Sequence, residues 1–101
     1  MHLVQILLPV TDNSGRSFSR KEFDLVKQEL AQRFKGVTAF LQAPAEGLWR
    51  HEDGSDRDRI VIFEVMVEDV DIADWRRRRT DLERQFRQDR IVIRYLPMAL
   101  I

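Results

Sequence analysis

Hydrophobic residues alternate along the first segment of the chain, residues 3–10 (LVQILLPV). Val4 and Ile6 fall on one face of this segment, whereas Gln5 falls on the other face between leucines. A period of two predicts a β-strand, and apolar residues on both faces predict that both faces are largely covered. The turn-forming run at residues 11–17 (TDNSGRS) predicts the end of this strand.

A helical period replaces the period of two after Ser19. Ser19 and Glu22 have the spacing of a capping box, in which each side chain bonds to a backbone N–H group of the first turn. Gly36 suits the left-handed residue that commonly ends a helix. The apolar positions between the two ends recur at helical spacing, and they are Phe23, Val26, Leu30 and Phe34. The pattern predicts an amphipathic helix between Ser19 and Gly36.

Strand patterns return at residues 36–43 (GVTAFLQA) and at residues 59–67 (RIVIFEVMV). Pro44 lacks the N–H group that a sheet needs and Gly47 relaxes the backbone, so we expect a kink or bulge there. Asp53-Gly54 is a strong two-residue turn signal. Together these features predict a β-hairpin whose far end projects beyond the main sheet.

A second helix and a last strand complete the pattern. Asp71 and Asp74 repeat the cap-plus-acid signal, and the apolar stripe that follows is Ile72, Trp75, Leu82 and Phe86. Residues 90–101 (RIVIRYLPMALI) predict a strand with an apolar tail. The order βαββαβ predicts an α+β, ferredoxin-like fold, in which a four-stranded antiparallel sheet carries two helices on one face. A length of 101 residues predicts one domain, residues 1–101.

Composition narrows the classes of partner and site. The chain is 44% hydrophobic and 34% charged, which is typical of a soluble globular protein. Lys plus Arg and Asp plus Glu both number 17, and a net charge of zero argues against binding of nucleic acid. The chain has no cysteine, which excludes disulfides, thiolate metal sites and thiol nucleophiles. We find no signal peptide and no membrane-spanning run, and so expect a cytoplasmic protein without a membrane partner.

Two charged runs could be taken for a nucleic-acid-binding surface and a metal site, but each has a simpler explanation. Arg76–Arg79 step about 100° each around a helix, so they cannot share one face, and nearby acids such as Asp74 and Asp81 are spaced for ion pairs. The acidic cluster that begins at His51 and ends at Asp58 does not match a calcium loop or a transition-metal site. We therefore interpret the two runs as a solvated helix surface and a charged hairpin tip, and expect neither a metal nor a cofactor.

A more informative set of residues follows from the predicted sheet. The first and third strands are central in this topology, and the fourth flanks the first. The face away from the helices then carries Gln5 and Glu64 on neighbouring strands, and Arg94 joins them if Ile91 and Ile93 face the helices. Charged groups on an otherwise apolar face require a reason, because burying each ion costs several kcal/mol.

Two reasons remain open at the level of sequence. Glu64 and Arg94 are either a structural pair within a dimer interface or the polar end of an apolar pocket that holds a small ligand. In the pocket hypothesis Trp49, Arg50 and His51 on the hairpin form a lid or rim. His51 exchanging protons near neutral pH, or Glu64 acting as a base where water is excluded, would make the site an enzyme.

The hairpin and the end of the chain both favour self-association. Leu48 and Trp49 are large apolar residues on a projecting arm, and Trp buries a large area at low entropic cost. The tail from Leu96 to Ile101 is mostly apolar, which is unfavourable if it is left exposed. We therefore expect the arm to contact a neighbouring subunit or to cap its barrel.

The chain as a whole resembles the dimeric α+β barrel superfamily. The stretch GVTAFLQAPAEGLWR (residues 36–50), followed by IVIFEVMV, is similar to that of small uncharacterised bacterial proteins of this group. The resemblance implies two ferredoxin-like sheets that meet by their helix-free faces in a homodimer or a higher homo-oligomer. It implies no catalytic residue, because relatives include cofactor-independent monooxygenases, isomerases, ligand-sensing modules and proteins of unknown function.

Three hypotheses of function follow from the sequence. The first is a homodimeric barrel that binds a small organic ligand. The second is a cofactor-independent, monooxygenase- or isomerase-like enzyme that uses Glu64 or His51. The third is a structural or regulatory interaction module with a filled barrel.

Overall fold

The computed structural model describes the backbone of residues 1–51 and 54–101, and the side chains of these residues except 42–45, 47, 49–51 and 54–58. The elements follow the predicted order, and their bounds are β1 His2–Pro9, α1 Arg20–Phe34, β2 Thr38–His51, β3 Gly54–Val67, α2 Ile72–Gln85 and β4 Val92–Pro97. The strands form an antiparallel sheet in the order β2-β3-β1-β4. The predicted ferredoxin-like fold is therefore confirmed.

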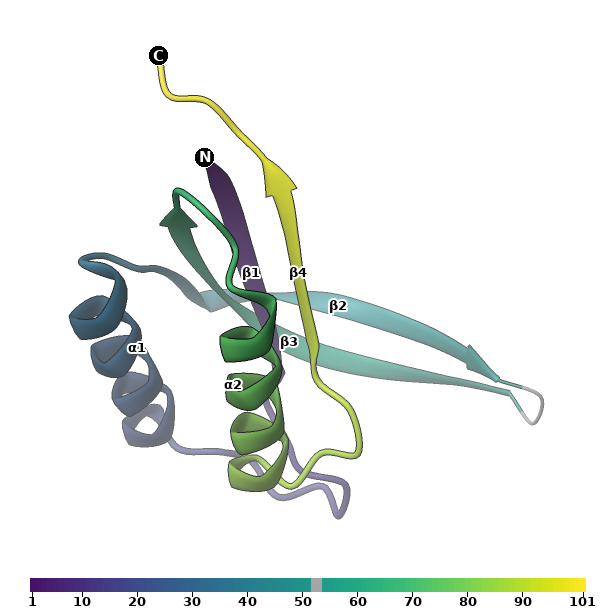
Figure 1. Cartoon of the computed structure of the whole chain (residues 1–101). Helices are drawn as coiled ribbons and strands as arrows, with labels where there is room; N and C mark the ends of the chain where they lie inside the picture. The colour runs from purple at the N-terminus through teal and green to yellow at the C-terminus, as the bar shows by residue number, and fades with distance from the viewer. Residues whose placement is uncertain (52–53) are drawn as a thin grey trace.

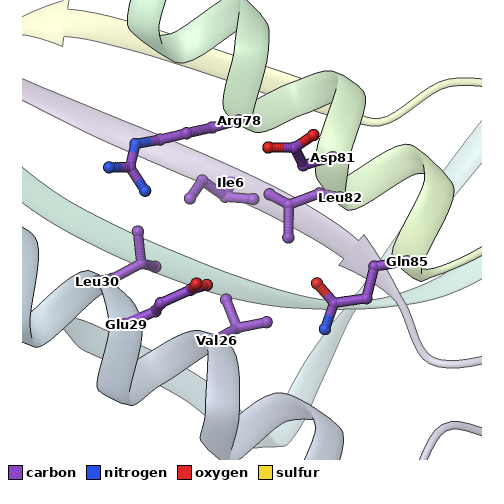
Figure 2. A pocket seen from close by; sticks show the side chains of 8 residues that line it. All are labelled: Ile6, Val26, Glu29, Leu30, Arg78, Asp81, Leu82 and Gln85. Atoms are coloured by element: carbon purple, nitrogen blue, oxygen red, sulfur yellow. The ribbon is translucent and has the colours of Figure 1, made fainter.

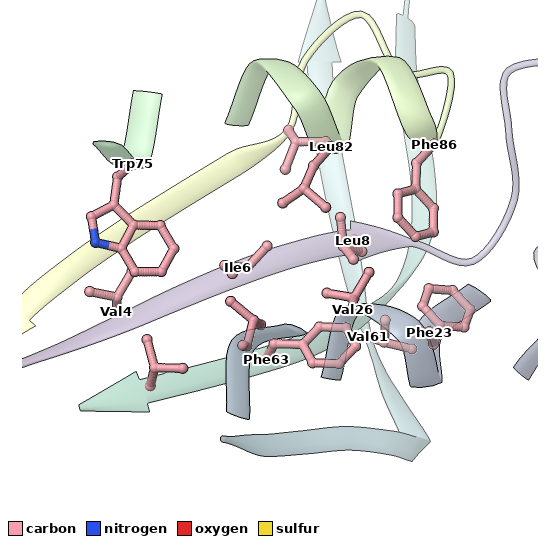
Figure 3. Close-up of a cluster of buried hydrophobic side chains, with 13 residues drawn as sticks. Val4, Ile6, Leu8, Phe23, Val26, Val61, Phe63, Trp75, Leu82 and Phe86 are labelled. Carbon is pink, nitrogen blue, oxygen red and sulfur yellow. The ribbon is translucent and has the colours of Figure 1, made fainter. Parts of the chain in front are cut away.

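Both helices lie on one face of the sheet (Figure 1). Most residues of β1 and β3 that face them are buried, as predicted by the period of two, and they include Ile6 and Phe63, which are both 0% exposed. Phe23 of α1 and Phe86 after α2 stack above these strands with ring centroids 5.7 Å apart (Figure 3). Phe34 and Trp75 stack at the other end of the helix pair, with centroids 5.0 Å apart. Aromatic contacts thus join the helices to each other and to the sheet.

The first helix begins as predicted and ends one residue earlier than predicted. The Ser19 side chain accepts a hydrogen bond from the backbone N–H of Glu22, and the Glu22 carboxylate accepts one from the backbone N–H of Ser19. The left-handed residue at the end of the helix is Lys35, with φ of 65°, so the expectation that Gly36 takes this role is wrong. The helix stops immediately after Phe34, whose ring is held against Trp75. The left-handed position at the end of the helix is therefore taken by lysine rather than by glycine.

The second helix carries its arginines as paired and solvated groups. Asp71 caps the helix through the backbone N–H of Asp74. Arg77 and Arg78 both bind the Asp74 carboxylate, at 2.9 and 3.1 Å. Burial of Asp74 favours its neutral form, but these arginines outweigh that effect and hold its pKa below the ordinary value. The predicted ion pairing of this surface is confirmed, with Asp74 rather than Asp81 as the partner of Arg77.

The loop between β1 and α1 is fixed to the end of α2 by a buried carboxylate. Asp12 accepts hydrogen bonds from the hydroxyl and backbone N–H of Ser14 and from the backbone N–H of Arg16. Arg87 reaches the same carboxylate from the end of α2 at 3.3 Å. The Ser14 hydroxyl bond, then the Arg16 bond, outweigh burial and hold the pKa of Asp12 below its ordinary value.

The hairpin of β2 and β3 projects away from the helices (Figure 1). The predicted bulge is present, because the register shifts between Phe40 and Ala45. The third strand is longer than the predicted segment 59–67, because it begins at Gly54, which pairs with His51. The predicted turn residue Asp53 lies outside the described residues. Among the described residues, no helix is long and apolar enough to cross a membrane.

Candidate functional site on the open face of the sheet

The sheet face opposite the helices, which we call the open face, carries one polar row between apolar rows. Residues that are directly paired in neighbouring strands point to the same face. Pairing across the sheet aligns four residues, one from each strand, in the order Thr38, Glu64, Gln5 and Arg94. The row on one side of this polar row is Phe40, Ile62, Leu7 and Val92, and the row on the other side is Met66, Leu3 and Leu96.

Several large apolar residues of the open face remain partly exposed within one chain, although Leu7 at its centre is buried. Phe40, Met66 and Leu96 expose 47%, 51% and 44% of their surface. Large apolar side chains that share one face mark a surface that another molecule covers. The open face therefore has the composition of an interface rather than of a solvated sheet surface.

Hydrogen bonds connect three members of the polar row. The Gln5 side-chain nitrogen donates to Glu64 Oε2 at 2.6 Å, and Arg94 Nε donates to the Gln5 side-chain oxygen at 2.8 Å. Because the amide nitrogen faces the carboxylate and the amide oxygen faces the guanidinium, both neighbours require the same orientation of Gln5. The predicted juxtaposition of Gln5, Glu64 and Arg94 is present, with Gln5 between the two charges.

Binding capacity remains on both charged ends of this chain of hydrogen bonds. A carboxylate accepts at two oxygens and a guanidinium donates through five N–H groups. Among the described residues, Glu64 Oε1 and the two terminal nitrogens of Arg94 have no hydrogen-bond partner. The row can therefore accept from a donor at one end and donate to an anion at the other, over an apolar surround.

The arm residues of the pocket hypothesis lie far from this row within one chain. The backbone of Trp49 pairs with Asp56 and that of His51 pairs with Gly54. These positions lie eight to ten residues before Glu64 on β3, a path of about 26–33 Å along the strand. Arg50, between them, is equally distant, and the three side chains lie outside the described residues. The structure does not bring the arm and the row together within one chain.

Sequence reasoning missed Thr38 and Phe40 as neighbours of the row. Both lie on the second predicted strand at positions that share one face by the period of two. Their alignment with Glu64 and Ile62 depends on the register before the bulge, which the sequence alone does not supply. The alternation of residues along the strand places both on one face, but no motif marks them as part of a site.

A hollow lies between the two helices, on the other face of the sheet (Figure 2). Its volume is about 120 Å³, and it is lined by Ile6 of the sheet, by Glu29 and Leu30 of α1 and by Asp81 of α2. Arg78 beside it is already bound to Asp74 and lies over the Phe34 ring, at 5.0 Å from the ring centre. This hollow is small and its cation is engaged, so the open face is the stronger candidate site.

Metal-ligating groups do not gather in the part of the chain whose side chains are described. No group of three or more His, Asp or Glu residues is placed there to hold an ion. The acidic cluster of the hairpin, from His51 to Asp58, lies outside the described side chains. The polar row itself contains one carboxylate and one cation, which is not a metal-ligand set.

Comparison with known proteins supports the fold. The chain matches no protein-family model, and no curated protein sequence matches it. Among solved structures it is similar to a divalent cation tolerance protein (Cut A1) from Thermus thermophilus, with a TM-score of 0.68 and 16% identity over 99% of this chain and 86% of that one. It is also similar to a phage SAM lyase in complex with S-methyl-5'-thioadenosine, with a TM-score of 0.57 and 10% identity over 94% of this chain and 79% of that one. At these identities the likeness shows the fold alone.

Proposed function

We propose that two copies of this chain pack their open faces together and bind a small organic molecule between the two sheets. The observation that carries the proposal is the polar row, a hydrogen-bonded chain from Glu64 through Gln5 to Arg94 within an apolar face. A purely structural interface gains more from apolar residues at such positions, since desolvated charges cost free energy unless they are fully bonded. Charges retained with unused donors and acceptors favour a binding role.

Apolar burial supports the pairing of two open faces. Met66 and Leu96 remain about half exposed in one chain although they share a face with Leu3. Each Å² of apolar surface removed from water contributes about 25 cal/mol. Two sheets packed face to face lie about 10 Å apart, which leaves the polar rows of both copies in one interior.

Charge order along the row supports a twofold arrangement. Glu64 and Arg94 lie on opposite sides of Gln5, on β3 and β4. A twofold axis parallel to β1 and midway between the sheets sets Glu64 of one copy opposite Arg94 of the partner subunit. A perpendicular axis in the same plane sets like charges opposite each other. Attraction therefore favours the first arrangement.

We further propose that the chain is a bacterial, cytoplasmic member of the dimeric α+β barrel group. In this proposal residues 1–101 form one domain. With the axis parallel to β1 the arms of both copies extend past the same end of the interior, which gives Trp49, Arg50 and His51 their proposed place at the rim of that end rather than over the row. The proposal assigns no reaction to the site.

Ligand binding to the dimer tests the proposed function. We would screen the protein by thermal shift against amino acids, organic acids and nucleosides, including S-methyl-5'-thioadenosine, and measure each hit by calorimetry. Solution mass is measured on the same samples. We expect at least one saturable ligand, and we expect Arg94→Met to weaken it by about tenfold while the dimer persists, because a charge-assisted bond is lost.

Arg79→Met is the matched control, since it removes the same charge from an exposed position of α2. It should leave ligand affinity unchanged. If Arg94→Met loses the dimer and the wild type binds no ligand, Glu64 and Arg94 are a structural pair. A wild-type dimer that binds nothing in the screen, or equal affinities of Arg94→Met and the wild type, would contradict the binding role.

A further inference from the structure

The polar row has the geometry of a gauge for ligand length. Hydrogen bonds of 2.6 and 2.8 Å, with one amide group between them, place Glu64 Oε2 and Arg94 Nε at most about 8 Å apart. Gln5 is held at both ends of its amide, so this separation is set by the register of three strands rather than by one flexible side chain. A ligand that lies along the row with its charged groups directly over both protein charges therefore separates those groups by at most about this distance.

The charge of the row specifies the charge of its ligand. Glu64 and Arg94 carry opposite unit charges, so the row is neutral in sum. Once a second sheet excludes water, a ligand with one net charge would add an uncompensated ion, which is costly in an apolar interior. A zwitterion keeps the interior neutral and gives each protein charge an opposite partner.

The side chains beside Gln5 determine the polarity of the middle part of the ligand. Leu3, Leu7 and Ile62 lie in the apolar rows beside Gln5, and the Gln5 amide uses one N–H donor and its oxygen within the row. A ligand segment above Gln5 therefore meets mainly carbon. Methylene groups match these side chains, and the second N–H of Gln5 remains as a donor to a polar atom in this segment.

We propose that the site binds a short ω-amino acid, with its ammonium group on Glu64 and its carboxylate on Arg94. This inference rests on the proposed function, because the second copy closes the site. An extended aliphatic chain advances about 1.25 Å per bond, so 5-aminopentanoate and 6-aminohexanoate separate their charged groups by about 6–8 Å. Shorter members must tilt toward the centre of the row to contact both protein charges, which weakens at least one of the two bonds, and longer ones must fold back to do so.

A homologous series of ligands tests the gauge on the wild-type protein. We would measure binding of glycine, 4-aminobutanoate, 5-aminopentanoate, 6-aminohexanoate and 8-aminooctanoate by calorimetry. Affinity should peak at five or six carbons and be at least about tenfold weaker for glycine, whose charged groups lie too close together to sit directly over both protein charges. Affinities that are equal along the series, or absent throughout, would overturn the inference.

Ligands with one charge deleted test the two ends without any mutation. Pentylamine lacks the carboxylate and pentanoate lacks the ammonium group, and each should bind the wild type about tenfold more weakly than 5-aminopentanoate. Arg94→Met should reduce the advantage of 5-aminopentanoate over pentylamine, and Glu64→Gln should reduce its advantage over pentanoate. Unchanged advantages in dimeric samples of these variants would contradict the assigned ends.

The outcomes separate this inference from the proposed function. A dimer that binds another class of compound in an Arg94-dependent way, but shows no preference along the series, retains the proposed function and rejects the gauge. A monomeric wild type rejects both. Arg79→Met, which should reproduce every wild-type ratio, controls for a general effect of charge.

Discussion

The two faces of the sheet are built from alternate residues of the same strands, yet only one of them completes its burial within a single chain. Phe63 faces the helices and is 0% exposed, whereas Phe40 on the open face is 47% exposed. The covered face contains apolar residues only where β1 and β3 meet the helices, while the open face carries a charged and hydrogen-bonded row. The difference indicates that the covered face stabilises the fold, and our proposal assigns the open face to contact with a second copy and a ligand.

The largest expected effect is the difference in stability lost when a phenylalanine is removed from each face of the sheet. Phe63→Ala should lower the free energy of unfolding by about 3–5 kcal/mol, because it opens a cavity in a close-packed core. Phe40→Ala should cost less than about 1 kcal/mol in dilute samples, since the ring is half exposed there. Urea denaturation of both variants checks the difference. Equal losses would show that the open face is already packed within one chain.

Gln5→Leu tests the polar row directly. The substitution removes the hydrogen bonds to Glu64 and Arg94 and leaves two charges without the amide between them. It should destabilise the protein by about 1 kcal/mol. Gln28→Leu on the exposed side of α1 is the control and should change stability little. A gain in stability from Gln5→Leu would argue that the row serves binding alone.

Acid should loosen the covered side of the molecule through Asp12. Its pKa is held below the ordinary value of 3.8, so its stabilisation is fully present above that pH and is lost as the pH falls through the lower folded value. Asp12→Asn should therefore show a shallower loss of stability than the wild type below about pH 4. Thermal melts between pH 7 and pH 2 check this, and identical pH profiles would be evidence against the role of Asp12.

The smallest expected effect is a gain in stability from a substitution at the end of α1. Lys35 holds a left-handed conformation that costs a side-chain-bearing residue about 1 kcal/mol, and glycine avoids most of this cost. Lys35→Gly should raise the free energy of unfolding by about 0.5 kcal/mol, measured by urea denaturation. Gly36→Ala, at the adjacent position with open space around its Cα, should not lower stability by more than that amount.

The central residues of the fold and of the row follow from the sequence because two simple rules determine them. The period of two assigns Gln5 and Glu64 to one face, and the βαββαβ order makes their strands neighbours. Arg94 joins them because the fourth strand flanks the first with Ile91 buried, as its 2% exposure confirms. These three positions needed no motif.

The remaining features depend on interactions that local patterns do not contain. Thr38 and Phe40 join the open face through a register that changes before Ala45. Phe34, the last residue of α1, stacks on Trp75, which comes from a distant part of the sequence. Asp12 draws Arg87 across 75 residues of chain, and no spacing rule predicts such a contact.

A charge exchange across the row tests most directly whether two open faces meet. Sedimentation velocity would give the mass of the wild type, Glu64→Arg, Arg94→Glu and the double variant over a range of concentrations. In the twofold arrangement each single reversal sets like charges opposite each other, whereas the double variant restores the attraction. We predict a dimer for the wild type and the double variant and a largely monomeric protein for each single variant. A monomeric wild type, or four proteins of equal mass, would contradict the pairing of the open faces.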